Sequence, residues 1–327
     1  MRFGLFGGPA RRGPETTDQD AYRAYIEGVL EAEKLGFYGT YLVEHHFTGR
    51  GQVSASLNLL SYAAARTTRI RLGTAVVVVP WHNPVLLAEQ AATVDLLSGG
   101  RLDLGLGRGY RDYEFSGFGV DRAEAGERFD EMLAFLRQAW HSQARFSFSG
   151  NHWQFSDIVV EPKPIQTPHP PIWVGAASPQ SIEAAATLGL KLFLDQVATT
   201  AEVAERVAIY RAAQAAAGLP HHPHDIALTR PLLLAETAKE RSALLESHLA
   251  TLGALSDSTS SAKNNPFYSD PQTRCERTED GAILGEATEC VERLQAIREL
   301  GIHQVLFTRT TPAALRRFAD SVMAAFA

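Results

Sequence analysis

The chain has 327 residues, 45% of them hydrophobic, and its 31 basic and 37 acidic residues give a net charge of −6. This length suits one large domain, because (β/α)8 barrels have about 250 residues or more, and the lack of a basic run argues against binding to nucleic acid. Cys275 and Cys290 are the only cysteines and form no CxxC pair, which argues against a disulfide framework or a zinc knuckle and favours a reducing cytoplasm.

The start of the chain predicts a strand rather than a targeting segment. Residues 2–7 are strand-like directly after Met1, so we expect no signal peptide. The most apolar run, Val76 to Val79, is ended by Pro80 and is far shorter than the ~20 residues that cross a bilayer. We therefore expect a soluble, cytoplasmic protein whose partners are small molecules, with no membrane or nucleic-acid partner.

Short β-rich runs alternate with longer helical patterns along the chain. The first half predicts strands at 2–7, 39–43, 70–79 and 102–107, and helices at 20–35, 54–66, 84–98 and 123–140. Alternation around Gly150-Asn151 predicts an inserted β-hairpin within 144–161. The second half predicts strands at 171–175, 190–194, 226–235 and 303–307, and helices at 179–188, 201–216, 237–252, 286–299 and 311–325.

Eight strands that alternate with helices favour a single α/β domain over 1–327, a (β/α)8 TIM barrel, rather than an open doubly wound sheet. The run 70–79 is almost continuously apolar, as in a parallel strand covered on both faces. No GxGxxG motif follows the first strand, which argues against a dinucleotide-binding unit. Residues 255–281 have few aliphatic side chains and predict a long mobile loop, either a lid or a disordered insertion.

Glu44-His45-His46 follows the second predicted strand, at the end of a barrel strand where active sites lie. Adjacent strand residues point to opposite faces, so the two histidines are not expected to bind one metal ion. One imidazole can serve as a general acid or base while the other packs, and a purely structural role is equally compatible with the motif alone.

Two further segments follow predicted strands. The alternate glycines of Gly105-Leu-Gly-Arg-Gly109 leave one face open to a flat ligand or to another backbone, and Arg108 could pair with a phosphate or with an ordinary carboxylate. Ser178-Pro179-Gln-Ser181 places a cap and free amides at a helix start, which suits a phosphate and also suits ordinary capping.

Aromatic residues also gather after the third and fourth predicted strands. These residues are Trp81, Tyr110, Tyr113 and Phe115, with His82 and Asn83 beside Trp81. They predict either an apolar pocket at the barrel mouth or ordinary packing.

The order and spacing of these segments resemble the bacterial luciferase-like flavin-dependent monooxygenase family, in particular the luciferase α-subunit. The likeness covers most of the chain and is most specific in its N-terminal half. The matching runs are 39–47 (GTYLVEHHF), 72–80 (LGTAVVVVP), 83–109 with DLLSGGRLDLGLGRG at its end, 175–186 (GAASPQSIEAAA) and 285–294 (GEATECVERL).

The resemblance implies roles for individual residues. His45 matches the family's catalytic histidine beside the flavin C4a edge, with Glu44 and His46 as neighbours that orient it. A non-prolyl cis peptide at Ala75-Val76 is implied beneath the isoalloxazine ring. The flavin phosphate is implied at Ser178, Ser181 and Arg108, so that the implied cofactor-binding residues are Ala75, Val76, Gly107, Arg108, Ala177, Ser178 and Ser181.

The resemblance also implies an activity. Reduced FMN (FMNH2) from a separate NAD(P)H:flavin reductase would react with O2 to form a C4a-hydroperoxide, which oxygenates an apolar or aromatic organic substrate. A homodimer is expected. The luciferase α-subunit has a reactive cysteine where this chain has Gly107, which argues against luciferase-specific aldehyde chemistry and light emission.

Three other functions stay open at this point. A relative that uses the deazaflavin F420 would transfer hydride instead of activating oxygen, and a non-catalytic relative would only retain the flavin. A metal-dependent barrel hydrolase is the third alternative, and it is disfavoured because no His-x-His lies on the first strand.

Overall fold

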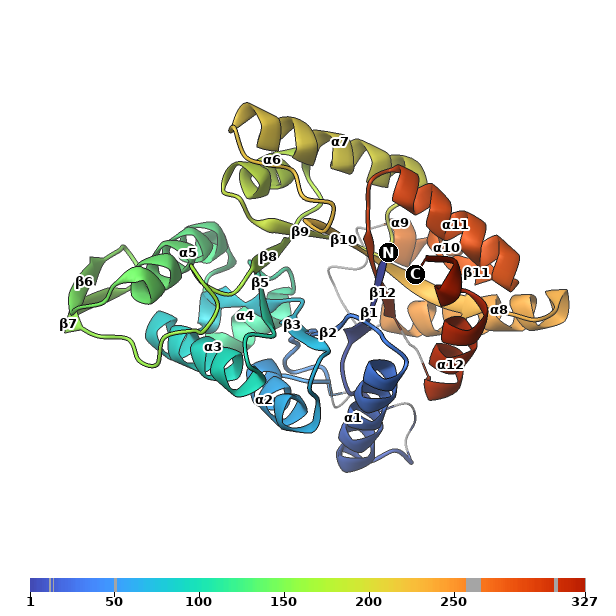
Figure 1. Cartoon of the computed structure of the whole chain (residues 1–327), viewed down its shortest axis with the longest axis horizontal. Helices are drawn as coiled ribbons and strands as arrows, with labels where there is room; N and C mark the ends of the chain where they lie inside the picture. The colour runs from blue at the N-terminus through green and yellow to red at the C-terminus, as the bar shows by residue number, and fades with distance from the viewer. Residues whose placement is uncertain (12, 14, 50–51, 257–265, 309–310, 327) are drawn as a thin grey trace. The chain divides into compact units, whose positions relative to one another are not determined.

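The computed structural model describes the whole chain except residues 12, 14, 50–51, 257–265, 309–310 and 327. Its parallel strands and surrounding helices form a (β/α)8 barrel, as the sequence predicts. The residues group into two compact units, which Figure 1 allows the reader to follow by label. The N-terminal unit is Gly8–Leu30 and Gly39–Trp173, and the C-terminal unit is Met1–Gly7, Glu31–Tyr38 and Val174–Ala327. A single domain over 1–327 stays a prediction.

Parallel strands form the sheet of the N-terminal unit. β2 pairs with β3, and β5 pairs with β3 and then with β4. The strands are β2 (Gly39–Leu42), β3 (Arg71–Thr74), β4 (Val77–Val78) and β5 (Leu102–Gly107), and the helices are α1 (Asp18–Lys34, which continues into the other unit), α2 (Ser56–Arg66), α3 (Pro84–Ser98), α4 (Asp112–Phe118) and α5 (Ala125–His141). Short 3-10 turns lie at Val79–Trp81 and Arg122–Glu124.

The strand predicted at 70–79 is divided into β3 and β4, so the prediction of one continuous strand is wrong. The break lies at Ala75-Val76, whose peptide bond is cis, as the resemblance implies. By contrast, α3 has the predicted bounds. The Asn83 side chain accepts hydrogen bonds from the amides of Val85 and Leu86, Pro84 takes the first helical position, and Gly99 ends the helix at φ +66°.

The predicted hairpin is present as β6 (Phe146–Ser149) and β7 (Gln154–Ile158). It lies beside α5 (Figure 1), and the Phe135 ring of that helix contacts three hairpin phenylalanines. The Glu131 carboxylate accepts hydrogen bonds from the amides of residues 151–153, which fixes the hairpin turn on the helix.

The strands of the C-terminal unit also pair in parallel, in the order β9, β10, β12, β1, with β11 against the end of β10. Its strands are β1 (Arg2–Gly7), β9 (Lys191–Leu194), β10 (Ile226–Leu234), β11 (Ile283–Gly285) and β12 (Gln304–Thr308), while β8 (Ile172–Gly175) spans the boundary between the units. Its helices are α6 (Pro179–Thr187), α7 (Thr200–Ala216), α8 (Ala238–Ser256), α9 (Pro266–Ser269), α10 (Pro271–Gly281), α11 (Ala287–Glu299) and α12 (Pro312–Ser321), followed by a 3-10 turn at Met323–Phe326.

The prediction of a loop at 255–281 is wrong for residues 266–281. Pro266–Ser269 and Pro271–Gly281 are helical, and α10 begins with Asp270 accepting a hydrogen bond from the Thr273 amide. This Asp-Pro start is a capping signal that the sequence analysis missed because few apolar residues follow it. Residues 257–265 lie outside the described part, and a lid stays a prediction.

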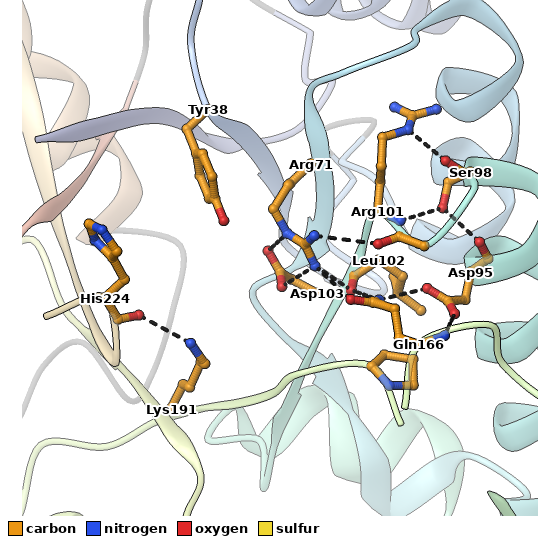
Figure 2. A network of polar contacts seen from close by, with 12 residues as sticks. Tyr38, Arg71, Asp95, Ser98, Arg101, Leu102, Asp103, Gln166, Lys191 and His224 are labelled. Atoms are coloured by element: carbon orange, nitrogen blue, oxygen red, sulfur yellow. Dashed lines mark hydrogen bonds and ion pairs between the residues drawn. The ribbon is translucent and has the colours of Figure 1, made fainter. Parts of the chain in front are cut away.

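Aromatic packing stabilises the strands of one unit, and an ion pair stabilises those of the other. In the C-terminal unit, the Phe3 ring contacts Phe307, Phe318 and Phe326 at 5.0–5.8 Å. In the N-terminal unit, Arg71 at the start of β3 makes a two-point ion pair of 2.8 Å bonds with Asp103 of β5 (Figure 2). None of the described helices is both long enough and apolar enough to cross a membrane.

Candidate active site

Glu44, two residues after β2, is the centre of a hydrogen-bonded cluster in the N-terminal unit. Its side chain is only 1% exposed. One carboxylate oxygen, Oε1, accepts hydrogen bonds from His46 Nε2 at 3.1 Å, Trp81 Nε1 at 3.0 Å and His82 Nε2 at 2.9 Å. Burial is the largest influence on the Glu44 pKa and raises it, but the hydrogen bonds from His46, His82 and Trp81 and the charge of His82 together leave the pKa lowered. Glu44 is therefore a buried carboxylate.

His45 turns to a different carboxylate. Its Nδ1 lies 3.3 Å from Oε1 of Glu114, and its own amide is held by the Val53 carbonyl at 3.0 Å. The Nδ1 atom is buried and has no well-aligned hydrogen bond among the described residues. Burial lowers the pKa of His45 and outweighs the opposing effect of Glu114. The ring is thus neutral near pH 7, with one nitrogen facing a carboxylate.

Glu114 comes from α4, a helix that the sequence analysis did not predict. Its Oε1 also accepts a hydrogen bond from the His46 amide at 3.0 Å and lies 3.7 Å from Arg111 Nη1. Burial raises the Glu114 pKa most strongly, yet His45, the His46 amide and Arg111 together leave it lowered. Glu114 therefore contacts the ring of His45 and the backbone amide of His46.

These contacts correct the expected roles around His45. Glu44 and His46 were expected to orient His45, but the bonds of Glu44 go to His46, His82 and Trp81, and the carboxylate beside the His45 ring is Glu114. The rings of His45 and His46 meet different carboxylates, because successive residues of an extended segment point to opposite sides.

Aromatic rings form a wall beside the Glu44 cluster. Trp81 stacks on Phe118 at 4.8 Å with an interplanar angle of 15°, and the His46 ring meets Phe118 edge-on at 4.7 Å. Phe115 meets the Trp81 ring edge-on at 5.4 Å. Arg111 donates hydrogen bonds to Tyr113 Oη at 2.7 Å and Tyr110 Oη at 3.2 Å. Of the aromatic residues noted in the sequence, Trp81 contacts the His46 ring at 5.8 Å and Phe115 packs on Trp81, whereas Tyr110 and Tyr113 contact Arg111.

Gly107, at the end of β5, leaves room for Val76. A Cβ atom at position 107 would lie 2.3 Å from Cγ2 of Val76, the residue that follows the cis bond. The close approach that the alternate glycines allow is therefore made, at this position, by another part of the chain. The neighbouring Arg108 side chain is 47% exposed and only loosely paired, with Nη2 4.0 Å from Asp130.

Ser178 and Ser181 lie at the start of α6, in the C-terminal unit. Ser178 Oγ accepts a hydrogen bond from the Ser181 amide at 3.3 Å and donates one to Ser181 Oγ at 3.0 Å. Ser181 Oγ donates to the Ser178 carbonyl at 2.9 Å. Pro179 occupies the first helical position, as expected. Ala177 precedes this cap and is exposed. The two hydroxyls are exposed and lie together at the positive end of a helix.

The missed residues are Glu114, Arg111 and the role of His82. Their signal was present in the chain, because His82 and Glu114 each follow a strand by a few residues, as Glu44 does. The carboxyl ends of neighbouring parallel strands meet at one edge, so these side chains can converge. Among the described residues, no group of three histidine, cysteine or carboxylate side chains is arranged to hold a metal ion.

The family model described as "Luciferase-like monooxygenase" matches residues 1–304. The chain belongs to this family. It is 28% identical over 353 aligned positions to the oxygenase component of flavin-dependent trigonelline monooxygenase from Acinetobacter baylyi, covering 100% of this chain and 96% of that protein. It is also 33% identical to an FMNH2-dependent dimethylsulfone monooxygenase from Pseudomonas putida, over 45% of this chain and 41% of that protein.

Solved structures agree with the fold. A monooxygenase from Streptomyces bottropensis superposes with a TM-score of 0.88 at 28% identity, with 100% of both chains covered. An F420-dependent secondary alcohol dehydrogenase reaches a TM-score of 0.79 at 16% identity, over 100% of this chain and 99% of that one, a likeness of fold alone. The luciferase-like protein is thus an oxidoreductase, a member of a family of flavin-dependent monooxygenases.

Proposed function

We propose that this enzyme uses reduced FMN and O2 to insert one oxygen atom into an organic substrate, and that His45 handles the proton. The observation that carries the proposal is the buried His45 ring, neutral near pH 7, whose Nδ1 faces Glu114 without a well-aligned hydrogen bond. A carboxylate beside Nδ1 favours the tautomer that has its proton there. The other ring nitrogen, Nε2, is then free to accept a proton from a bound reactant.

The residues proposed to hold FMN suit its parts. Ser178 and Ser181 offer two exposed hydroxyls at a positive helix end, which is a good environment for a phosphate. Arg108 is available to an anion because its contact with Asp130 is long. Ala75, Val76, Gly107 and Ala177 have small or compact side chains, as close approach of a flat ring requires, and they complete the set that the family resemblance assigns.

When bound, reduced FMN would supply the two electrons with which one oxygen atom of O2 is transferred to the substrate while the other leaves as water. The protein's own part is to position groups and to move a proton. Glu114 lies beside the His45 ring, and the Val53 carbonyl accepts a hydrogen bond from the His45 amide. Glu44 accepts hydrogen bonds from the rings of His46 and His82. The rings of Trp81, Phe115 and Phe118 favour an apolar or aromatic substrate and limit the access of water.

The decisive experiment follows flavin and oxygen together. The purified protein receives FMN, a flavin reductase and NADH without oxygen, oxygen is then admitted, and flavin absorbance, oxygen uptake and product are recorded. Oxygen uptake coupled to an oxygenated product supports the proposal. Retained flavin with no oxygen uptake would favour a binding protein instead.

The identity of the flavin is part of the proposal, because one structural neighbour is F420-dependent. Parallel titrations with reduced FMN and with reduced F420 distinguish the two. Tight binding of F420 with hydride transfer to a carbonyl compound, and no binding of FMN, would replace the monooxygenase proposal by the deazaflavin alternative.

A homodimer remains part of the proposal. On α3, the side chains of Leu86, Leu96 and Leu97 are 55%, 43% and 62% exposed, which is unusual for three leucines of one helix. A second copy of the chain would cover such a surface. Light scattering of the purified protein measures the mass and decides between one copy and two.

A further inference from the structure

Cationic and titratable side chains gather at one edge of the C-terminal unit that the proposed chemistry does not use. The strands β9, β10, β12 and β1 are neighbours in one parallel sheet, with Leu192 beside Ile226, Ala227 beside Gln304, and Gln304 beside Arg2. At or just before the amino-terminal end of each strand stands one basic side chain. These four residues, Lys191, His224, His303 and Arg2, are called the basic edge below.

The members of the basic edge are close to one another. The rings of His224 and His303 are 6.0 Å apart, and the His222 ring lies 5.3 Å from that of His224. The Arg2 amide donates to the His303 carbonyl at 2.7 Å. Lys191 Nζ donates to the His224 carbonyl at 3.4 Å, a contact that Figure 2 shows. Parallel pairing therefore fixes the spacing of the four groups.

Negative charge at this edge is scarce. The Asp225 carboxylate is engaged by Lys191 at 3.2 Å and by the His222 amide at 3.1 Å. The Arg2 guanidinium lies over the Tyr38 ring, 4.1 Å from its centroid, and donates to the Tyr38 hydroxyl at 2.9 Å. In the described part of the chain, neither Arg2 nor His224 nor His303 forms an ion pair with a carboxylate.

Near this edge, two buried nitrogens have no hydrogen-bond partner in the described part of the chain. They are Nδ1 of His224 and Nε of Arg211, which lack a hydrogen bond among the described residues. Arg211 belongs to α7, and it is one of the positive groups that act on His303. A buried polar atom without a partner is costly unless a ligand or water supplies one. The basic edge thus has ring and guanidinium nitrogens that can bond to a ligand, and the charge of Arg2 is not paired with a carboxylate in the described part of the chain.

Burial and neighbouring positive charges lower the pKa values of the two histidines of the basic edge. Burial, followed by the charges of Arg2, His222, His303 and Lys191, lowers the pKa of His224 to about 4. Burial also lowers the pKa of His303, followed by Arg298, the terminal ammonium of Met1, Arg211 and His221. The charges that shift the pKa values of these two rings most strongly are positive, so an anion placed among them would favour their protonated forms.

We propose that the basic edge binds a phosphate-sized oxyanion through Arg2, His224 and His303. Phosphate carries two negative charges near neutral pH and accepts several hydrogen bonds, which matches a guanidinium and two imidazolium donors. The basic edge is distinct from the Ser178 and Ser181 part of the proposed FMN site within the C-terminal unit, because it lies at the amino-terminal ends of its strands, whereas Ser178 follows the carboxyl end of β8. Binding is expected to be coupled to uptake of protons by the histidines.

The pH dependence has a definite sign. A histidine whose pKa is lower in the folded than in the unfolded chain binds fewer protons when folded, so stability falls as the pH drops from about 6.5 towards 4. A bound oxyanion opposes this loss because it raises the histidine pKa values. The stabilising effect of phosphate is therefore expected to be larger at pH 6 than at pH 8.

Thermal unfolding with inorganic phosphate tests the proposal, with NaCl at equal ionic strength as the reference. At ten times the dissociation constant we expect phosphate to raise Tm by about 2 °C or more at pH 6, and by less at pH 8. NMR titration should show the His224 and His303 signals moving to higher pKa values when phosphate is present. Equal shifts with NaCl, or an effect that does not depend on pH, would overturn the proposal.

Variants locate the site. His224→Asn together with His303→Asn should abolish the phosphate effect, and His141→Asn, an exposed histidine at the end of α5, should keep it. Ser178→Ala with Ser181→Ala should also keep it, which separates this site from the proposed FMN phosphate site. If phosphate stabilises the His224/His303 variant as much as the unchanged protein, the basic edge does not bind it. Arg2→Gln is the second test, since it should weaken the effect while both histidines stay in place.

Discussion

His45 is the residue on which the proposed proton transfer depends. We expect His45→Ala to keep the thermal stability and flavin binding of the unchanged protein but to lower product formation about 10²- to 10⁴-fold, the usual effect of losing a general acid or base. Hydrogen peroxide should rise as oxygen uptake becomes uncoupled. His46→Ala is the matched neighbour, and it should act mainly on stability, because His46 donates to the buried Glu44 carboxylate. Turnover by His45→Ala at the unchanged rate would refute the role.

Glu114 acts, in this proposal, through His45 as a positioning residue. The Glu114 carboxylate, 3.3 Å from Nδ1, raises the His45 pKa against the effect of burial, so Glu114→Gln should lower that pKa further and move the acid limb of the kcat/KM profile to lower pH. Glu127→Gln, an exposed carboxylate on α5, is the control. An unmoved acid limb would show that Glu114 is only structural, and Glu114→Asp should restore part of the unchanged profile.

Gly107 is expected to be required for packing. In Gly107→Ala the new methyl group would meet Val76 Cγ2 at 2.3 Å, so one of the two segments must move. We expect a loss of about 1–3 kcal/mol in the free energy of unfolding, the usual cost of overpacking. Gly126→Ala is the matched control, because nothing lies within 4 Å of its Cβ position and alanine favours a helix. Chemical denaturation measures both, and an equal stability of the two variants would contradict the prediction.

At the scale of an element, the start of α6 is proposed to bind the FMN phosphate. Ser178→Ala with Ser181→Ala should weaken reduced-FMN binding by roughly 1.5–3 kcal/mol per lost charge-assisted bond. The same change removes a helix cap, which costs about 1 kcal/mol of stability. Thr311→Ala separates the two effects, because Thr311 caps α12 through the Ala314 amide. It should lower stability without changing FMN binding, and normal FMN binding by the serine variant would refute the assignment.

Elements also differ in how well the chain predicts them. β5 and α3 were predicted with their observed bounds, because an apolar run and a pair of end signals, Asn83-Pro84 and Gly99, mark them. α4 was missed, since a helix of 7 residues is too short to show a period. Glu114 was missed with it. The break at Ala75-Val76 has no local signal in an apolar run, and only the family resemblance indicated it.

For the whole molecule, the alternation of strands and helices predicted the barrel class. It did not predict which side chains of the candidate site contact one another. Sequence spacing placed His45 and Glu44 at a strand end, yet it could not show that Glu44 binds His46 and His82 while Glu114 faces His45. Such pairings depend on which strand ends are neighbours and on side-chain directions. The contact between the two histidines of the basic edge could not be predicted from the sequence either. His224 and His303 are more than 75 residues apart in the chain, and only the pairing of β10 with β12 brings them together.

The whole enzyme is expected to depend on an external source of reduced flavin. The chain has no GxGxxG motif after its first strand, and the trigonelline enzyme that it resembles over its full length is named as an oxygenase component. The pure protein given FMN, substrate and NADH should therefore form no product, and product should appear once a flavin reductase is added. Chemically reduced FMN should replace the reductase in a single turnover, which excludes a need for contact between the two proteins. Rapid NADH oxidation by the pure protein alone would contradict the prediction, because it would require a nicotinamide site within this chain.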